Sequence, residues 1–157
     1  MNKKQTEILS DYVLHTALHM ITLEEQCLKR VCASDLSVRE LHVIEAVSSL
    51  SNAGKNTMAE VAKYLHVSPA SLTSAVNVLV KKGYIVREYS PIDRRVIYIT
   101  LTESGEVVNR KYLDFVRDLM LYIGRDLDEE TADRMIDTIM KAVDYFERAA
   151  DGDLSFE

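Results

Sequence analysis

The stretch SPASLTSAVNVLVKKGYIVREYSPIDRRVIYITLTESG, residues 68–105, decides the fold of this chain. It opens with serine followed by proline, a strong helix start, because the hydroxyl can cap the first turn and proline fits the first helical position. Lys81 and Lys82 then suit the negative end of the helix dipole, and Gly83 supplies a left-handed exit. The sequence therefore predicts a helix over about residues 69–82.

A strand hairpin is predicted immediately after this helix. The runs YIVREY and VIYITL are rich in β-branched and aromatic residues, and the six residues SPIDRR connect them. Thr102 follows the second run and is placed to open another helix. A capped helix joined directly to a two-stranded hairpin is the second half of a winged helix-turn-helix.

The first half of that motif lies upstream. SVRELHVIEAV (37–47) and TMAEVAKYL (57–65) each place a glutamate three residues after a serine or threonine, which is the capping-box pattern of a helix start. These patterns predict helices that end near Leu50 and Leu65. The residues HVS then form the turn to the next helix.

Both ends of the chain are predicted to be helical, with more apolar surface than one core can bury. Residues 5–31 hold neither Gly nor Pro, and apolar residues recur at spacings of three and four over about 102–124 and 128–149. Such surfaces suggest a subunit interface. The expected fold is mainly α with a small β-hairpin wing, in the order α-α-α-α-β-β-α-α. The expected organisation is a single domain, residues 1–157, with a winged helix-turn-helix lobe over 37–102 and a helical dimerisation region over 1–36 and 103–157.

The charge is unevenly distributed along the chain. The 157 residues have a formal net charge of -6, but residues 55–95 hold seven basic and three acidic side chains, a net charge of +4. Residues 1–54 carry a net charge of -2 and residues 96–157 a net charge of -8. A basic centre between acidic flanks suits a protein that meets a polyanion on one surface only.

Several classes of protein are disfavoured. No run of residues resembles a membrane span or a secretory signal, so the expected location is the cytoplasm. Two cysteines are too few for a disulfide framework and match no zinc spacing. No Gly-rich phosphate loop, nucleophile elbow or metal-ligand set is present, so we expect no enzyme activity, no metal and no cofactor.

The polar side of the helix over 69–82 is predicted to read double-stranded DNA. Leu72, Val76, Leu79 and Val80 are assigned to the core, which leaves small hydrogen-bonding side chains on the other side, as contact with base edges in the major groove requires. The predicted DNA-facing residues are Ser68, Ala70, Ser71, Thr73, Ser74 and Asn77, with Lys81 and Lys82 contacting phosphates.

The tip of the hairpin is predicted to enter a neighbouring minor groove. Arg94 and Arg95 supply the positive charge that a narrow minor groove attracts, and Pro91 stiffens the turn. Asp93 is expected to hold one of the two guanidinium groups through a bidentate pair. Which arginine enters the groove is left open by the sequence.

The run LVKKGYIVREYSPIDRRVIYITLTESG resembles the signature of the MarR family of bacterial transcription regulators. The matching positions are Leu79, Gly83, Ile85, Arg87, Asp93, Arg95, Leu101, Thr102 and Gly105. The run MAEVAKYLHVSPASLTSAVNVLVKKG is similar to the helix-turn-helix of that family, and the resemblance extends over nearly the whole chain. It implies a homodimer whose interface is built from the first and last two helices, a pseudo-palindromic operator, and an effector cleft between that interface and each DNA-binding lobe.

The runs SDYVLHTALHMITLEEQCLK and LSVRELHVIEAV are similar to those of the repressors of bacterial fatty-acid synthesis genes. This narrower resemblance implies a repressor of fatty-acid biosynthesis genes that is released by a small-molecule or acyl-carrier effector.

Four more residues are candidates for effector or redox roles. His15 and His19 are one helical turn apart but lack the glutamate of an HExxH metal site, so the lining of an interface or cleft is favoured. Cys27 or Cys32 could sense oxidants, as a cysteine in the first helix does in some members of that family, although packed thiols are the simpler interpretation. A winged-helix module that binds protein instead of DNA is the remaining alternative.

Overall fold

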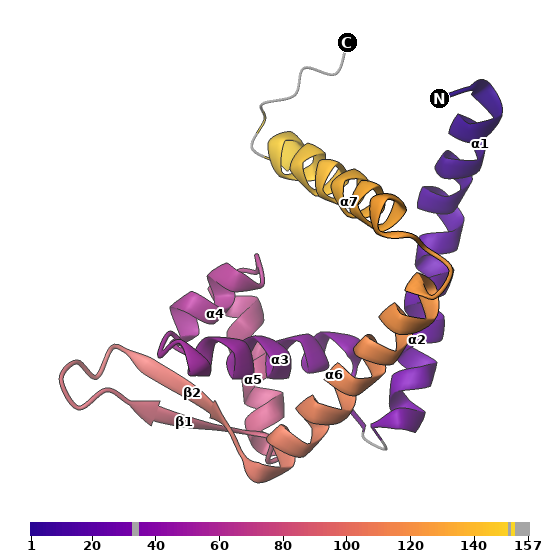
Figure 1. Cartoon of the computed structure of the whole chain (residues 1–157). Coiled ribbons are helices and arrows are strands. Elements are labelled where there is room, and N and C mark those ends of the chain that lie inside the picture. Colours follow the sequence, from indigo (N-terminus) through magenta and orange to yellow (C-terminus); the bar gives the residue numbers. More distant parts are fainter. Residues whose placement is uncertain (33–34, 151, 153–157) are drawn as a thin grey trace. The chain divides into compact units, whose positions relative to one another are not determined.

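The computed structural model describes residues 1–32, 35–150 and 152 (Figure 1). Over these residues the chain is mainly helical with one two-stranded antiparallel sheet. The elements in chain order are α1 (Lys3–Asp11), the π-helical turn η1 (Tyr12–Thr16), α2 (Ala17–Val31), α3 (Val38–Asn52), α4 (Met58–Tyr64), α5 (Pro69–Lys81), β1 (Ile85–Tyr89), β2 (Ile97–Leu101), α6 (Glu103–Gly124) and α7 (Glu129–Ala150). The predicted fold class and element order are confirmed, with α1, η1 and α2 together occupying the place of the first predicted helix.

The chain divides into two compact units, residues 1–115 and 116–157, so α6 belongs partly to each. The predicted lobe over 37–102 lies within the first unit, and its boundaries stay a prediction. In the part of the chain that the structure describes, no helix is both long and apolar enough to cross a membrane.

The predicted helix starts are confirmed at the level of single hydrogen bonds. The side chain of Ser37 accepts a hydrogen bond from the backbone of Glu40, and the Glu40 carboxylate accepts one from the backbone of Ser37 at 2.7 Å. Thr57 caps α4 by accepting from the Glu60 backbone at 3.2 Å, and Ser68 caps α5 by accepting from the Ser71 backbone at 3.1 Å, with no reciprocal bond at either helix among the described residues. Asp128 caps α7 by accepting from the Thr131 backbone at 2.7 Å.

The core of the first unit is built around α3, which contacts α2, α4, α5 and β2. Figure 1 shows α3, α4 and α5 grouped beside the hairpin, whose tip projects beyond them. Burial of apolar area is the main term that holds such a lobe together. The largest fully buried side chains are Leu28, Leu36, Leu41, Ile44, Leu72, Leu79, Ile85, Ile99, Val47, Val61 and Val76.

One predicted core residue of α5 is placed differently. Leu72, Val76 and Leu79 are almost inaccessible to solvent, whereas Val80 is 38% exposed, so its assignment to the core is wrong. The three buried residues lie along one narrow face of the helix, and Val80 falls at the edge of that face because successive residues turn by about 100°.

The turn between α4 and α5 holds a non-glycine residue in the left-handed region. His66 has a φ of 51°, its backbone N–H donates to Lys63 at 3.1 Å, and the N–H of Val67 donates to Ala62 at 3.0 Å. These two bonds form a Schellman ending, in which the left-handed position is usually glycine. They end α4 sharply, so that only four residues separate its end at Tyr64 from the start of α5 at Pro69.

The hairpin is fastened at the middle of β2 to the loop between α3 and α4. The backbone carbonyl of Asn56 accepts a hydrogen bond from the Ile99 N–H at 2.9 Å, and the Asn56 side-chain amide donates to the Ile99 carbonyl at 2.9 Å. In the sheet, Arg87 of β1 pairs with Ile99 of β2. The wing is therefore held on the same frame as the helix-turn-helix.

A compact junction joins α5, the hairpin and α6. The Thr102 hydroxyl donates to the Gly83 carbonyl at 2.7 Å and accepts from the Gly105 N–H at 3.1 Å, while the Thr102 N–H donates to Tyr84 at 3.0 Å. A Cβ at Gly105 would overlap the Tyr84 carbonyl oxygen and lie 3.2 Å from the Leu101 Cβ. The threonine and glycine of the LTESG run are thus explained by this close approach.

Candidate nucleic-acid interface

The predicted reading face of α5 is open to solvent. Its hydroxyl groups bond within the helix itself: Thr73 donates to Pro69 at 2.8 Å and Ser74 donates to Ala70 at 3.1 Å. A hydroxyl bonded in this way keeps acceptor capacity and can turn to a new partner. The exposed members of the predicted face are Ser68, Ala70, Ser71, Thr73, Ser74 and Asn77.

Asn77 is engaged by a residue that was not among the predicted contacts. The Arg87 side chain reaches from β1 and its Nη1 donates to the Asn77 Oδ1 at 2.7 Å. Its Nη2 is buried and has no hydrogen-bond partner among the described residues. In the sequence, Arg87 stood out only as a match to a family signature. Its contact with Asn77 joins a strand to a helix, and such a contact cannot be predicted from sequence spacing.

The two lysines at the end of α5 have different surroundings. Lys81 is exposed and, among the described residues, makes no ion pair. Lys82 is only 23% exposed in its side chain and lies 3.0 Å from the Glu40 carboxylate and 3.5 Å from that of Asp35. It also donates to the Asp35 backbone carbonyl at 3.0 Å. Lys82 therefore links the end of α5 to the start of α3, and we keep only Lys81 as the phosphate contact.

The link between Lys82 and Glu40 shifts the pKa of both groups. Burial alone would raise the pKa of Glu40, but hydrogen bonds from Ser37 and Lys82 hold it below its usual value. Burial alone would lower the pKa of Lys82, but Glu40 and Asp35 together raise it. Both shifts favour the charged pair, so the pair stabilises the fold while both groups are ionised.

Lys82→Met should lower the free energy of unfolding by about 1–3 kcal/mol at neutral pH, because it leaves a half-buried carboxylate without its charged partner. A depressed carboxyl pKa contributes stability that is lost as the pH falls through it, and a raised lysine pKa contributes stability that is lost as the pH rises through it. The loss in free energy of unfolding, relative to the parent protein, should therefore be largest between about pH 5 and 9 and should shrink in acid. Urea unfolding at several pH values measures it, with the exposed Lys81→Met as control; equal effects of the two variants would contradict the structural role.

At the tip of the wing, Asp93 orders the backbone and does not hold a guanidinium group. Its Oδ1 accepts from the Arg95 backbone N–H at 2.9 Å, and its own carbonyl accepts from Val96 at 2.9 Å. The Ser90 hydroxyl accepts from the backbone of Ile92 and Asp93 at 3.3 Å each. The expected bidentate pair with an arginine is absent from the described residues, since a short turn places the carboxylate nearest to backbone N–H groups.

The two wing arginines line different depressions. Arg95 lines a shallow groove of about 380 Å³ with Pro69 and Thr73 of α5, the proposed recognition helix. Arg94 lines a separate depression with Tyr89 and Pro91. Both side chains are exposed and neither is paired within the described residues. Arg95 is thus the arginine on the side of the recognition helix.

The four candidate effector or redox residues do not form one site. His15 is exposed and lies 4.0 Å from Asp11, and His19 is exposed on α2. Among the described residues, no three His, Cys, Asp or Glu side chains are grouped to hold a metal. Cys27 is exposed and Cys32 is buried, and both are free thiols.

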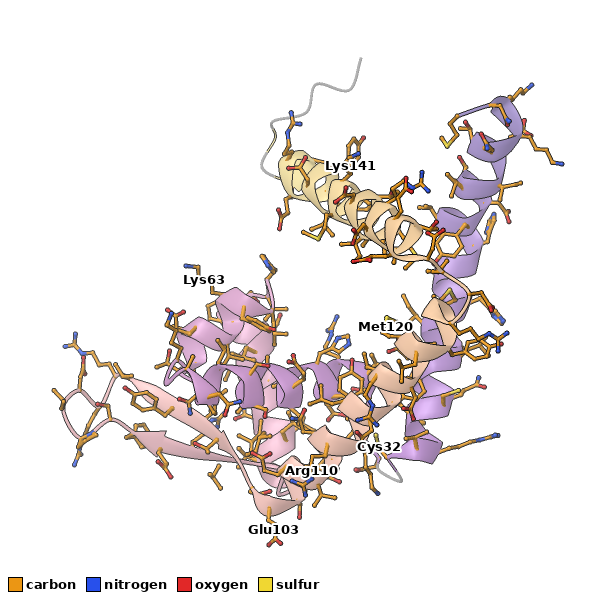
Figure 2. The ribbon with its side chains drawn as sticks, viewed as in Figure 1. Cys32, Lys63, Glu103, Arg110, Met120 and Lys141 are labelled. Carbon is orange, nitrogen blue, oxygen red and sulfur yellow. The ribbon has the colours of Figure 1, made fainter. Side chains whose placement is uncertain are left out.

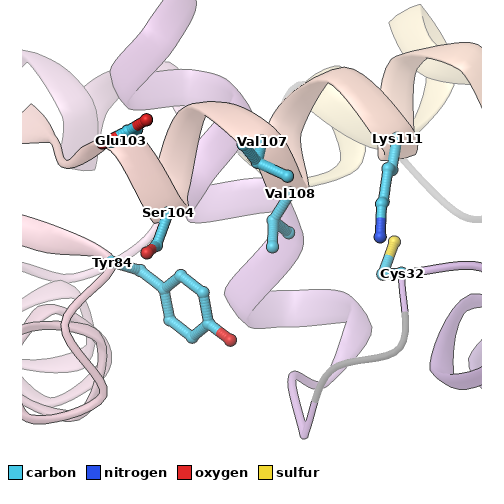
Figure 3. Close-up of a pocket in the computed structure, with 7 residues that line it drawn as sticks. All are labelled: Cys32, Tyr84, Glu103, Ser104, Val107, Val108 and Lys111. Carbon is cyan, nitrogen blue, oxygen red and sulfur yellow. The ribbon is translucent and has the colours of Figure 1, made fainter.

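Cys32 lies in a shallow pocket of about 350 Å³ beside α6. Figure 2 shows Cys32 at the start of the connection after α2, and Figure 3 shows the Lys111 ammonium extending toward its thiol. Burial raises the pKa of the Cys32 thiol, and the positive charge of Lys111 only partly opposes this effect. The thiol is therefore held in its protonated form, which is the less reactive one.

An apolar groove of about 510 Å³ lies between α2, α3 and the start of α5. Ile21, Val43 and Leu72 supply apolar walls, and Arg39 and His42 add polar groups. The His42 ring also lies 6.0 Å from that of Tyr112 on α6. His42 was not among the predicted site residues, because its place in this groove depends on the packing of three helices, which sequence spacing does not reveal.

Comparison with known proteins agrees with this geometry. A model described as MarR family matches residues 34–96. The chain is 30% identical over 105 residues to the HTH-type transcriptional regulator YcgE of Bacillus subtilis, covering 66% of this chain and 68% of YcgE. It is 26% identical over 105 residues to the transcriptional repressor MdtR of the same organism, covering 67% of this chain and 66% of MdtR. A further Bacillus subtilis relative is covered over only 37% of its length.

Among solved structures, Streptococcus pneumoniae FabT in complex with DNA is similar with a TM-score of 0.78 and 26% identity. The match covers 92% of this chain and 99% of that one. The likeness therefore extends well beyond the helix-turn-helix.

Proposed function

The chain belongs to the MarR family of winged helix-turn-helix transcriptional regulators, which are not enzymes, and from this premise we propose that it is a repressor that binds a pseudo-palindromic operator as a homodimer. The observation that supports DNA reading best is the exposed polar face of α5 next to an unpaired Arg95 on the wing. Lys81 and Arg94 add positive charge to the same lobe. A helix can enter the major groove while a neighbouring hairpin reaches the minor groove.

The proposed dimer interface comprises the helices at the two ends of the chain. In α7 none of the residues is buried, and its apolar side chains recur at spacings of three and four. The second half of α6 is similar, with Met120, labelled in Figure 2, 51% exposed. So much uncovered apolar surface is unusual for a monomer, and a second copy of the chain would cover it. The most exposed of these side chains are Leu121, Tyr122, Ile136, Ile139, Met140 and Phe146.

The proposed effector site is the apolar groove between α2, α3 and α5. Its volume suits a small molecule, and its lining suits an acyl-type or other elongated apolar ligand. The groove includes Ser68 and Ser71 at the start of the recognition helix, so a ligand there would respond to a tilt of α5. A ligand that binds the two tilts differently would shift the protein toward or away from the operator-binding form.

An acyl effector would make this protein a regulator of fatty-acid biosynthesis genes, in line with the resemblance of residues 10–29 and 36–47 to the repressors of those genes. Saturated fatty acids of graded chain length should then weaken DNA binding with a clear optimum in length. Weakening that is independent of chain length would contradict a shaped acyl site.

Selection from a pool of random duplexes tests the proposed function. The full-length protein should enrich two inverted half-sites whose centres lie about one duplex turn, roughly 10 base pairs, apart. Enrichment of no sequence by an intact dimer would instead favour a winged helix that binds protein. A redox switch at Cys32 is disfavoured, because burial raises the pKa of its thiol and keeps it in the less reactive protonated form.

A further inference from the structure

Arg87 occupies an unusual position for a basic residue in a DNA-binding lobe. It lies on β1 and its side chain is half-buried. Its Nη1 donates a hydrogen bond to the Asn77 Oδ1 on α5 at 2.7 Å. Its Nη2 has no partner among the described residues and is closed off from solvent. One terminal nitrogen of this guanidinium group is thus closed off from solvent, and the other is directed at a side chain of the reading face.

The chemistry of the two groups fixes the orientation of the Asn77 amide. A guanidinium group carries only donors, so the amide must turn its oxygen toward Arg87. The bond is charge-assisted and short, which makes it stronger than a neutral hydrogen bond. The Nδ2 group, with its two N–H donors, is then left for the exposed side of the helix.

This orientation changes what Asn77 can recognise. An unconstrained asparagine reads adenine with two bonds, because its oxygen accepts from N6 and its nitrogen donates to N7. With its oxygen turned toward β1, Asn77 presents donors only. Donors suit the acceptors of the major groove, which are N7 and O6 of guanine, O4 of thymine and N7 of adenine. Guanine offers two adjacent acceptors to the Asn77 N–H groups, whereas adenine offers one acceptor beside the N6 donor, which the turned oxygen no longer meets.

We propose that Arg87 is a positioning residue that sets the base preference of Asn77, restricting it to acceptor groups and disfavouring adenine. This inference rests on the proposed function and deepens it. In this proposal Arg87 does not contact DNA itself. It acts by orienting the amide of Asn77, which lies on the exposed face of α5.

The test compares duplex selection profiles of full-length variants. Arg87→Met keeps an unbranched, although shorter, side chain and has no donor, so the freed amide should shift the preference at one symmetric pair of operator positions toward adenine by about fivefold or more. Arg87→Lys retains a donor and should stay close to the parent profile. Lys81→Met removes the same charge from an exposed site and should weaken all sequences alike.

The Asn77→Ala variant tests whether Arg87 acts through the Asn77 amide. In that background Arg87→Met should leave the base profile unchanged, because the amide through which Arg87 acts is gone. A shift toward adenine that persists without Asn77 would overturn the inference, as would an unchanged profile in Arg87→Met with Asn77 present. If Arg87→Met does not fold, Arg87→Lys, which carries only donors, is compared with Arg87→Gln, whose carbonyl can accept from the Asn77 amide and release its orientation. A shift toward adenine in Arg87→Lys, or no shift in Arg87→Gln, would equally overturn the inference.

The outcomes separate the two claims. If the parent protein selects no sequence, the proposed function fails. If it selects an operator and the Arg87 variants do not behave as described, only the inference about Arg87 fails.

Discussion

Arg95→Ala should lower operator affinity by about 10- to 100-fold while leaving the fold and the dimer intact. Arg95 is exposed, lines the groove beside Pro69 and Thr73, and its side chain has no partner among the described residues. Its removal therefore takes a positive charge from the DNA-facing side without disturbing the protein. Anisotropy titration with a labelled operator duplex measures the loss.

Arg94→Ala is the matched control, because it removes the same charge from the same turn but on the side of Tyr89 and Pro91. We expect a smaller loss there. Equal losses would mean that the wing contributes only charge, and no loss in Arg95→Ala would contradict entry of Arg95 into a groove.

Gly105→Ala should destabilise the protein by about 1–3 kcal/mol, toward the upper end of that range, because the added methyl group meets backbone that cannot turn aside. The overlap is with the Tyr84 carbonyl, which also accepts the hydrogen bond from Thr102. Moving that carbonyl loosens the junction of α5, the hairpin and α6. Thermal unfolding at fixed protein concentration measures the effect, and a fall of several degrees is expected.

Gly124→Ala is the control for this prediction, since a Cβ at Gly124 meets nothing within 4 Å. Alanine in that helical position should be neutral or slightly stabilising. A Gly105→Ala variant as stable as Gly124→Ala would show that the junction yields more easily than its contacts indicate.

Local sequence patterns predicted most of the fold. Ser37, Thr57, Ser68 and Thr102 each begin a helix because one side-chain oxygen satisfies a nearby backbone N–H, and such bonds span only three residues. The strands were visible for a similar reason, since their residue types favour extended backbone. The π-helical turn over residues 12–16 has no such marker in the sequence.

Contacts between elements could not be read in the same way. Lys82 and Glu40 are 42 residues apart, and Arg87 and Asn77 sit on a strand and a helix, so both pairs depend on how α3, α5 and β1 pack. The sequence therefore identified the recognition helix and the wing correctly as exposed elements but misjudged Lys82 and Asp93. Lys82 pairs with Glu40 where a phosphate was expected, and Asp93 accepts from the Arg95 backbone where a guanidinium group was expected.

We propose that this lobe binds DNA through the α5 face and the wing. This binding is tested most directly by measuring the affinity for the selected duplex as the salt concentration rises. A dimer that contacts several phosphates should lose about 1,000-fold in affinity between roughly 50 and 200 mM salt, with a shallower slope in Arg95→Ala. Affinity that is insensitive to salt, or a slope identical in the parent and the variant, would contradict the claim.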